Sequence, residues 1–298
     1  MREFSRRPLP KASKVQTNLR FVVRSSIPCS MPAFTDQLHR TISLPGTPRR
    51  IISLVPSQTE LLYALGLEEE VVGITKFCIH PTAWHRSKTR VGGTKNIHPD
   101  IIRSLQPDLI LANKEENEQQ QIEELLPHYP VWVSDIATLE DALEMIRTVG
   151  DLTGRTENAL SLAQNIQQAF QTQTSIPPSH RRRTAYFIWR NPWMVAGGGT
   201  FIQHMLEHCG FVNIFHDRSR YPVIQLEELV QKDCELVLLS CEPYPFREKH
   251  IDEIKTALPS AAVTLVNGEM FSWYGSRLLE SPAYFRRLQQ GLQENYPL

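Results

Sequence analysis

A chain of 298 residues is long enough for two domains of ordinary size, each with its own core. Its 32 basic residues balance its 32 acidic residues, so nothing in the charge indicates a nucleic-acid partner. The five cysteines are odd in number and lack CxxC spacing, which argues against a disulfide framework or a zinc knuckle, and no apolar run approaches the ~20 residues of a membrane span.

The first 30 residues are basic but contain no apolar stretch like the core of an export signal. The longest candidate, Phe21-Val22-Val23, is broken at once by Arg24. Met31 begins a more ordinary segment, so residues 1–33 are expected to be a disordered arm or a misannotated start rather than a targeting peptide. The sequence as written carries nothing that an export machinery would recognise, and it therefore predicts a cytoplasmic location.

Residues 34–150 alternate short apolar strands with helices. Ile51-Ile52-Ser53-Leu54-Val55 is a continuous run, typical of a strand that is buried on both faces. Pro56 ends it, and Ser57-Gln58-Thr59-Glu60 has the pattern of a capping box that opens a helix. Further strands are predicted at 71–74, 109–112 and 131–133. This alternation predicts a first lobe with a parallel sheet.

Two helices are expected next. Thr138 is predicted to cap the first, in which Leu139, Leu143 and Ile146 share one face. The second runs from about 156 to 172 and, at 1.5 Å per residue, spans roughly 25 Å. That length suits a strut, so residues 151–176 are assigned to a single connecting helix.

Residues 177–298 resume the alternation, with a glycine turn at 197–199 and a helix at 201–208 that Thr200 is expected to cap. Strands are predicted at 185–189, 236–239 and 263–266, and a final amphipathic helix at about 276–292. The fold class predicted for the chain is α/β, with two Rossmann-like lobes of parallel sheet joined by a single long rigid helix.

An internal repeat supports the two lobes. Residues 100–115 align without a gap on residues 227–242, and each copy reads as a short amphipathic helix, a break, a buried strand and a polar loop with an acid. Each copy also opens with a carboxylate, Asp100 in the first and Glu227 in the second. Two similar lobes leave a cleft between them, which favours binding over chemistry.

In open α/β sheets, ligands lie beyond the carboxyl ends of the strands, and here those loops are rich in aromatic and polar side chains. Such rings hold large flat apolar ligands, while a few polar groups orient them. Trp189 belongs to a strand, which favours the core, whereas Trp273 and Tyr274 lie in a glycine-flanked loop, which favours ligand contact. The predicted ligand-binding residues are Ser57, Gln58, Thr59, Phe77, His80, Lys114, Trp189, Trp193, Glu269, Phe271, Trp273, Tyr274 and Arg277.

Metal binding and catalysis have weaker support. His80 precedes a proline in a loop, where a histidine more often bonds a backbone group than a metal. Gly197-Gly198-Gly199 could bind an anion but lacks GxGxxG or GxxxxGK spacing, and no Ser-His-acid set stands out. Other histidines are scattered without pairing, at His85, His98, His204 and His216. The sequence therefore predicts a binding protein with no metal site and no cofactor, not an enzyme.

Seven segments follow one another between residues 34 and 292. They are the opening segment 34–54, Pro56-Ser57-Gln58-Thr59-Glu60-Leu61-Leu62, Val72-Gly73-Ile74, His80-Pro81, Val91-Gly92-Gly93, Pro107-Asp108-Leu109-Ile110-Leu111 and Gly210-Phe211-Val212-Asn213-Ile214-Phe215. In order and spacing they resemble the cobalamin- or siderophore-type solute-binding proteins of ABC importers, and most closely the cobalamin-binding periplasmic proteins. The chain departs from that pattern at His39, where the family commonly has glycine, and in lacking an export signal.

The resemblance implies a monomeric receptor that captures a corrinoid such as cobalamin between its lobes and delivers it to an importer permease. The loop after the last strand would then hold the corrin, with Glu269, Ser272 and Arg277 on its amides and Phe271 and Trp273 on the ring or the nucleotide base. Haem, with His80 or Tyr274 as axial ligand, or a ferric siderophore is the alternative ligand. An intracellular corrinoid carrier is the alternative role.

The resemblance also implies that Asp100 and Glu227 contact basic residues of the permease, one in each lobe. The family works in the periplasm, which conflicts with the location that the sequence itself predicts. The plainer interpretation of the two acids is that each complements a helix amino terminus, worth a few tenths to ~1 kcal/mol.

Overall fold

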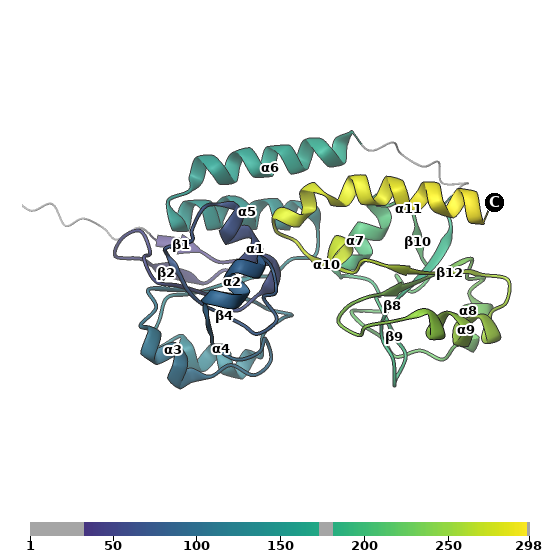
Figure 1. Cartoon of the computed structure of the whole chain (residues 1–298), viewed down its shortest axis with the longest axis horizontal. Coiled ribbons are helices and arrows are strands. Elements are labelled where there is room, and N and C mark those ends of the chain that lie inside the picture. The colour runs from purple at the N-terminus through teal and green to yellow at the C-terminus, as the bar shows by residue number, and fades with distance from the viewer. Residues whose placement is uncertain (1–32, 173–180, 297–298) are drawn as a thin grey trace, which may run out of the picture. The chain divides into compact units, whose positions relative to one another are not determined.

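The computed structural model describes residues 33–172 and 181–296, so most of the predicted arm at 1–33 lies outside the described residues. Two five-stranded sheets, in the orders β5-β4-β3-β6-β7 and β10-β8-β11-β12 with β9 beside β8, define a first and a second lobe (Figure 1). Every strand pair in them is parallel except β8 with β9. The α/β fold class with two parallel-sheet lobes is confirmed.

The first lobe begins with an antiparallel hairpin of β1 and β2 and then alternates strands with helices. Its buried strands are continuous apolar runs because helices cover both faces of a parallel sheet. The elements of this lobe are β1 (Ala33–Thr35), β2 (Thr41–Ser43), β3 (Ile51–Ser53), α1 (Pro56–Ala64), β4 (Val71–Ile74), α2 (Thr82–Ser87), β5 (Thr89–Arg90), α3 (Pro99–Leu105), β6 (Leu109–Asn113), α4 (Gln119–Leu125), β7 (Val131–Ser134) and α5 (Leu139–Thr153).

The second lobe is built in the same way and ends with a long helix that runs back along the lobe. After the helix α6 (Thr156–Gln171), its elements are β8 (Arg183–Trp189), β9 (Met194–Val195), α7 (Phe201–His208), β10 (Val212–Asn213), α8 (Glu227–Gln231), β11 (Leu236–Ser240), α9 (Glu248–Ala257), β12 (Ala262–Val266), α10 (Glu269–Ser272), the 3₁₀ turn η2 (Ser276–Leu279) and α11 (Ser281–Asn295).

Two predicted helix starts are confirmed. The Thr138 hydroxyl accepts the backbone N–H of Asp141 at 3.2 Å, which makes a capping box at the start of α5. The Thr200 hydroxyl accepts from Gln203 N at 3.2 Å and caps α7.

Two other predictions are wrong. No side chain caps α1, which begins at Pro56. The Glu60 carboxylate instead accepts from Arg277. The predicted helix at 276–292 is split into η2 and α11 around Glu280, and Pro282, which has no N–H to continue a helix, lies in the first turn of α11.

The predicted connecting segment corresponds mainly to α6. The helix before it, α5, continues to Thr153 and ends at Gly154, whose φ of +67° closes the helix in the left-handed region. At Gly150, a Cβ atom would collide with that of Ala159, so glycine lets α5 and α6 pack closely. The predicted lobe boundary at 150 therefore falls inside α5. A rigid strut over 151–176, of which residues 173–176 lie outside the described residues, stays a prediction.

One apolar cluster connects the helices of the two lobes. It includes residues of α1, α5, α6, α7 and α11, and Phe170 of α6 meets Phe285 of α11 edge to face at 6.4 Å. Each sheet also has one smaller apolar cluster of its own, on the face that does not contribute to the shared cluster. Across residues 33–172 and 181–296, no helix has both the length and the apolarity that crossing a membrane requires.

Candidate ligand-binding site

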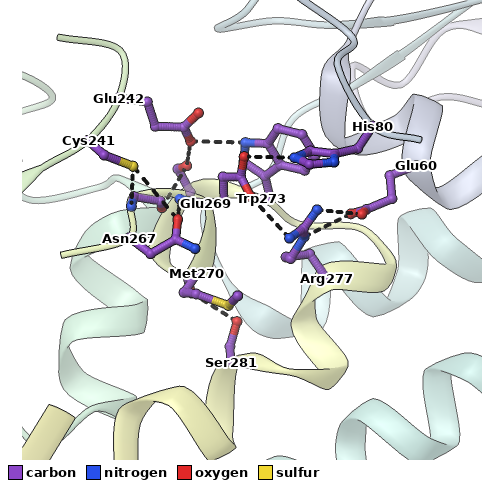
Figure 2. Close-up of polar contacts among 12 residues, drawn as sticks. Glu60, His80, Cys241, Glu242, Asn267, Glu269, Met270, Trp273, Arg277 and Ser281 are labelled. Atoms are coloured by element: carbon purple, nitrogen blue, oxygen red, sulfur yellow. Dashed lines mark hydrogen bonds and ion pairs between the residues drawn. The ribbon is translucent and has the colours of Figure 1, made fainter. Parts of the chain in front are cut away.

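Polar contacts connect loops at the carboxyl ends of the two sheets. Arg277, after β12, makes a bidentate pair with Glu60 of α1, with N–O distances of 2.5 and 3.1 Å. Its remaining nitrogen lies 3.0 Å from Glu269, and Nε2 of His80 lies 3.3 Å from the same carboxylate. Figure 2 shows these side chains converging around Trp273. Four residues of the predicted site, His80, Glu269, Trp273 and Arg277, are therefore brought together.

Trp273 anchors the loop that follows β12. Its indole N–H donates to Glu242 Oε1 at 2.9 Å (Figure 2). The Ser272 hydroxyl donates to the same oxygen at 2.7 Å. Burial raises the pKa of Glu242, while these two donors oppose that shift. Beside it, a Cβ atom on Gly275 would lie 2.5 Å from the Ser57 carbonyl oxygen, so the loop approaches α1 as only glycine allows.

A second set of contacts involves the loop after β6. The Tyr221 hydroxyl donates to Glu115 Oε2 at 2.9 Å, and the Arg220 guanidinium pairs with the same carboxylate. The neighbouring Glu116 is half-buried, and burial together with the negative charge of Glu242 raises its pKa to about 7. Four glutamates thus gather where the two sheets end: Glu115, Glu116, Glu242 and Glu269.

Two aromatic rings of the predicted ligand-binding set, Phe77 and Trp189, are exposed. Trp189 is 40% exposed, because it is the last residue of β8 and extends past the covering helices, and it packs edge to face on Tyr244 at 5.7 Å. Phe77 is 51% exposed, with the Lys76 ammonium 5.0 Å from its ring centre. The prediction of a core position for Trp189 was wrong.

Trp273 and Tyr274, expected to be open to a ligand, are both only 6% exposed. Tyr274 packs edge to face on Phe201 at 5.8 Å, because its loop folds back onto α1 and α7. Phe271 is fully buried between Tyr186 and Phe285. These rings stabilise the loop and present little surface to a ligand in this structure.

The other predicted residues lie in separate surroundings. Ser57, Gln58 and Thr59 are buried in the first turns of α1, where Gln58 donates to Ser134 Oγ at 2.6 Å. Lys114 is half-exposed and pairs with Asp135 at 2.6 Å. Trp193 stacks on Phe246, with 6.2 Å between the ring centres. Ligand contact stays a prediction for each of them.

Sequence reasoning missed Glu60, Arg220 and Tyr221. Glu60 was assigned to a capping box, and its distant partner Arg277 leaves no local signal. Arg220 has a φ of +66°, in the left-handed region, in a loop with no motif. The expectation that the histidines lie unpaired is also wrong for His204, because one turn of α7 places it beside His208.

Both repeat acids are exposed near the start of their helices. The Asp100 side chain is 93% exposed and pairs with Arg103 at 2.9 Å, next to a hollow of about 590 Å³ lined by residues of α3, α4 and the segment that follows α4. Glu227 begins α8, and neither α3 nor α8 has a side-chain cap. In α8, it is Glu228 that accepts from the backbone, at Gln225 N, 2.8 Å away. Hydrogen-bond capping therefore does not account for Asp100 or Glu227.

Comparison with known proteins shows the family of the chain. The sequence profile of the periplasmic binding protein family matches residues 51–262. The chain belongs to this family. A vitamin B12-binding protein of Pectobacterium carotovorum is 27% identical over 240 residues, which cover 78% of this chain and 85% of the relative.

Solved structures share the fold. The periplasmic vitamin B12 binding protein BtuF of Vibrio cholerae superimposes with a TM-score of 0.67 at 22% identity, covering 82% of this chain and 98% of that chain. The periplasmic heme-binding protein BhuT, in complex with two hemes, gives a TM-score of 0.69 at 21% identity, covering 83% and 100%. The family consists of substrate-binding proteins, not enzymes; its members bind small molecules and work with ABC transporters.

Proposed function

We propose that this chain captures a corrinoid at the carboxyl ends of its two sheets and delivers it to an ABC importer. The observation that carries the proposal is the gathering of Glu115, Glu116, Glu242 and Glu269 there. The carboxamide side chains of a corrinoid offer N–H donors that suit carboxylate acceptors. Relatives named vitamin B12-binding proteins support this choice.

The same four carboxylates disfavour an anionic ligand. The propionates of haem, or a negatively charged ferric siderophore, would place like charges against them unless Arg220, Lys95 or Arg277 left their present partners. Two carboxylates already occupy Arg277. Charge complementarity thus favours a neutral, amide-rich ligand.

Phe77 and Trp189, one from each lobe, are exposed rings that could hold a flat macrocycle. They follow β4 and end β8, at the carboxyl edges where ligands of open α/β sheets bind. The loop of Trp273 is buried, so it would stabilise this surface rather than contact the ligand with its rings.

Haem is the second candidate, because the His80 side chain is 35% exposed next to this loop and some solved neighbours bind heme. An imidazole that served as an axial ligand would have to leave the Glu269 carboxylate. That competition is a second reason, besides the charge of the propionates, for ranking haem below a corrinoid.

A ligand panel tests the proposal. Isothermal titration with cyanocobalamin, haem and a ferric hydroxamate siderophore should give saturable one-to-one binding for cyanocobalamin alone. The variants Phe77→Ala and Trp189→Ala should each weaken that binding about tenfold or more, since each removes a ring of the proposed platform. Tyr63→Ala, which removes an exposed ring on α1, is the matched control and should leave it unchanged.

No cyanocobalamin binding at hundred-micromolar concentration, with tight binding of haem, would overturn the corrinoid assignment. In that case, His80→Ala should abolish the Soret shift of the bound haem if His80 is its ligand. Equal losses in Tyr63→Ala and Trp189→Ala would show that the proposed platform is not the site.

A further inference from the structure

Two histidines on α7 face each other one helical turn apart. The Nε2 atoms of His204 and His208 are 3.1 Å apart, and the ring centres are 4.7 Å apart with the planes nearly perpendicular. Positions i and i+4 share one face of a helix, which is the spacing used by paired histidine ligands of zinc. None of the polar contacts of the candidate ligand-binding site involves this pair.

The separation of the two nitrogens suits chelation. With metal–nitrogen bonds of about 2.0–2.1 Å, nitrogens 3.1 Å apart subtend about 98° at a shared ion. That angle lies between the ~90° of square-planar or octahedral coordination and the ~109° of a tetrahedron. In the free protein the same approach accommodates a hydrogen bond, in which one ring donates and the other accepts.

Neighbouring groups surround the two rings. The second nitrogen of His204, Nδ1, lies 4.0 Å from a carboxylate oxygen of Glu207, beyond hydrogen-bond distance but close enough for the negative charge to favour a bound cation. The His208 ring packs edge to face on Phe170 of α6, with 5.0 Å between the ring centres. The His204 side chain is 29% exposed, so an ion and its water ligands can reach the pair.

We propose that His204 and His208 form a two-histidine site for a divalent late transition-metal ion such as Ni²⁺, Cu²⁺ or Zn²⁺. Imidazole nitrogen suits these ions, and hard Mg²⁺ or Ca²⁺ would not compete for it. Within residues 33–172 and 181–296, no group of three or more His, Cys, Asp or Glu side chains could hold a metal. Water therefore completes the coordination, and the affinity is moderate.

Titration of the untagged full-length protein with NiCl₂, followed by calorimetry, tests the site. The wild type should bind one Ni²⁺ ion more tightly than any other, and His204→Gln and His208→Gln should each weaken that event at least tenfold, because one imidazole cannot chelate. His128→Gln removes an exposed histidine outside the pair and should leave the isotherm unchanged. Circular dichroism verifies that each variant is folded.

A second measurement needs only the wild-type protein. With one equivalent of Cu²⁺, electron paramagnetic resonance should show two equatorial nitrogens on a single copper. Wild-type isotherms in both glutamine variants, or a copper spectrum without paired nitrogens, would overturn the proposal and leave the pair as a hydrogen bond. The result does not depend on which ligand binds at the carboxyl ends of the sheets, so it is separable from the proposed function.

Discussion

The two copies of the internal repeat occupy equivalent places but differ in what their acids contact. The offset that aligns Asp100 with Glu227 also aligns β6 with β11 residue for residue. Each strand is fully buried and lies inside its sheet, β6 between β3 and β7 and β11 between β8 and β12. A shared pattern of apolar residues therefore produces the same element in the same position.

The loops after these strands differ. Glu115 reaches Arg220 and Tyr221 in the other lobe, whereas its counterpart Glu242 stays within its own lobe and accepts from Ser272 and Trp273. Local sequence determines where each acid emerges from its sheet. Loops distant in the sequence determine which residues each acid contacts. Of the two matched acids, Glu115 contacts the other lobe and Glu242 does not.

The largest change in the free energy of unfolding is expected in β6 and β11, the buried strands that the two copies share. Leu111 and Leu238 are matched positions of the repeat, both 0% exposed and both in the apolar cluster that connects the lobes. Leu111→Ala and Leu238→Ala should each lower the free energy of unfolding by about 2–5 kcal/mol, because each leaves a cavity. Urea unfolding measures this. A loss below about 1 kcal/mol in either variant would show that the two strands are not equivalent in packing.

The next largest change in stability is expected at Glu116, the residue directly after the first copy of the repeat. The second copy has no acid there, because Pro243 follows it. The pKa of Glu116 is raised from 4.5 to about 7. Between these values the folded chain holds a proton that the unfolded chain has lost, so stability falls as pH rises from 4.5 to 7 and stays reduced above 7. Glu116→Gln should remove this penalty and stabilise the protein at pH 8 by about 1–3 kcal/mol.

Denaturant midpoints at pH 5 and pH 8 test that prediction. The wild type should lose more stability between these pH values than Glu116→Gln does. Glu115→Gln is the neighbouring control: it weakens the pairing with Arg220 and should not stabilise. Identical pH profiles for the wild type and Glu116→Gln would refute the raised pKa.

Sequence reasoning succeeded where the determinants are local. The strands at 109–112 and 236–239, and the caps at Thr138 and Thr200, follow from apolar runs and from side chains three residues from their partners. It failed where partners are distant. Glu60 pairs with Arg277 across the chain, and Trp189 is exposed because β8 extends past its cover.

Much of the candidate site depends on contacts between residues that are distant in the sequence. His80, Glu269 and Arg277 were predicted from their places after strands, but nothing local indicated that they share one network. Trp273 and Tyr274 appeared open because glycine follows them, yet that glycine lets the loop fold onto α1. Without tertiary contacts, a loop that faces a ligand cannot be told from one that packs inward.

A smaller effect should separate the contact between lobes from the contact within one. Tyr221→Phe removes one donor to Glu115, and Ser272→Ala removes one donor to Glu242. Each should lower the free energy of unfolding by about 1 kcal/mol, because a second donor to the carboxylate remains. The two variants should differ in which segments become less protected. Hydrogen exchange should rise in both 114–117 and 218–222 for Tyr221→Phe, but only in 267–273 for Ser272→Ala.

Exchange that stays unchanged at 114–117 in Tyr221→Phe would show that this hydrogen bond does not couple the lobes. Faster exchange at 218–222 in Ser272→Ala would show that the two acids form one network after all.

The smallest stability change and the most selective functional change are expected at Asp100 and Glu227. Both are exposed at the start of their helices, and the salt bridge from Asp100 to Arg103 is open to solvent. Exposed pairs of this kind contribute little to stability. Asp100→Lys and Glu227→Lys should therefore shift the melting temperature by no more than about 2 °C. Under the proposed docking role, each should slow importer-dependent uptake several-fold, because a reversed rim charge repels basic permease residues and hinders encounter.

Glu157→Lys is the matched control for these two reversals, since Glu157 is also an exposed acid in the first turn of a helix but lies outside the repeat. It should lose the same small helix-dipole energy and leave uptake unchanged. Melting curves and uptake assays on the three single variants and the Asp100→Lys/Glu227→Lys double variant separate the two roles. If the repeat acids only complement their helices, all three singles will destabilise alike and uptake per folded molecule will not change. If they dock, uptake will fall in the two repeat variants, fall further in the double, and remain intact in Glu157→Lys, because only the repeat places one acid on each lobe for the permease to read.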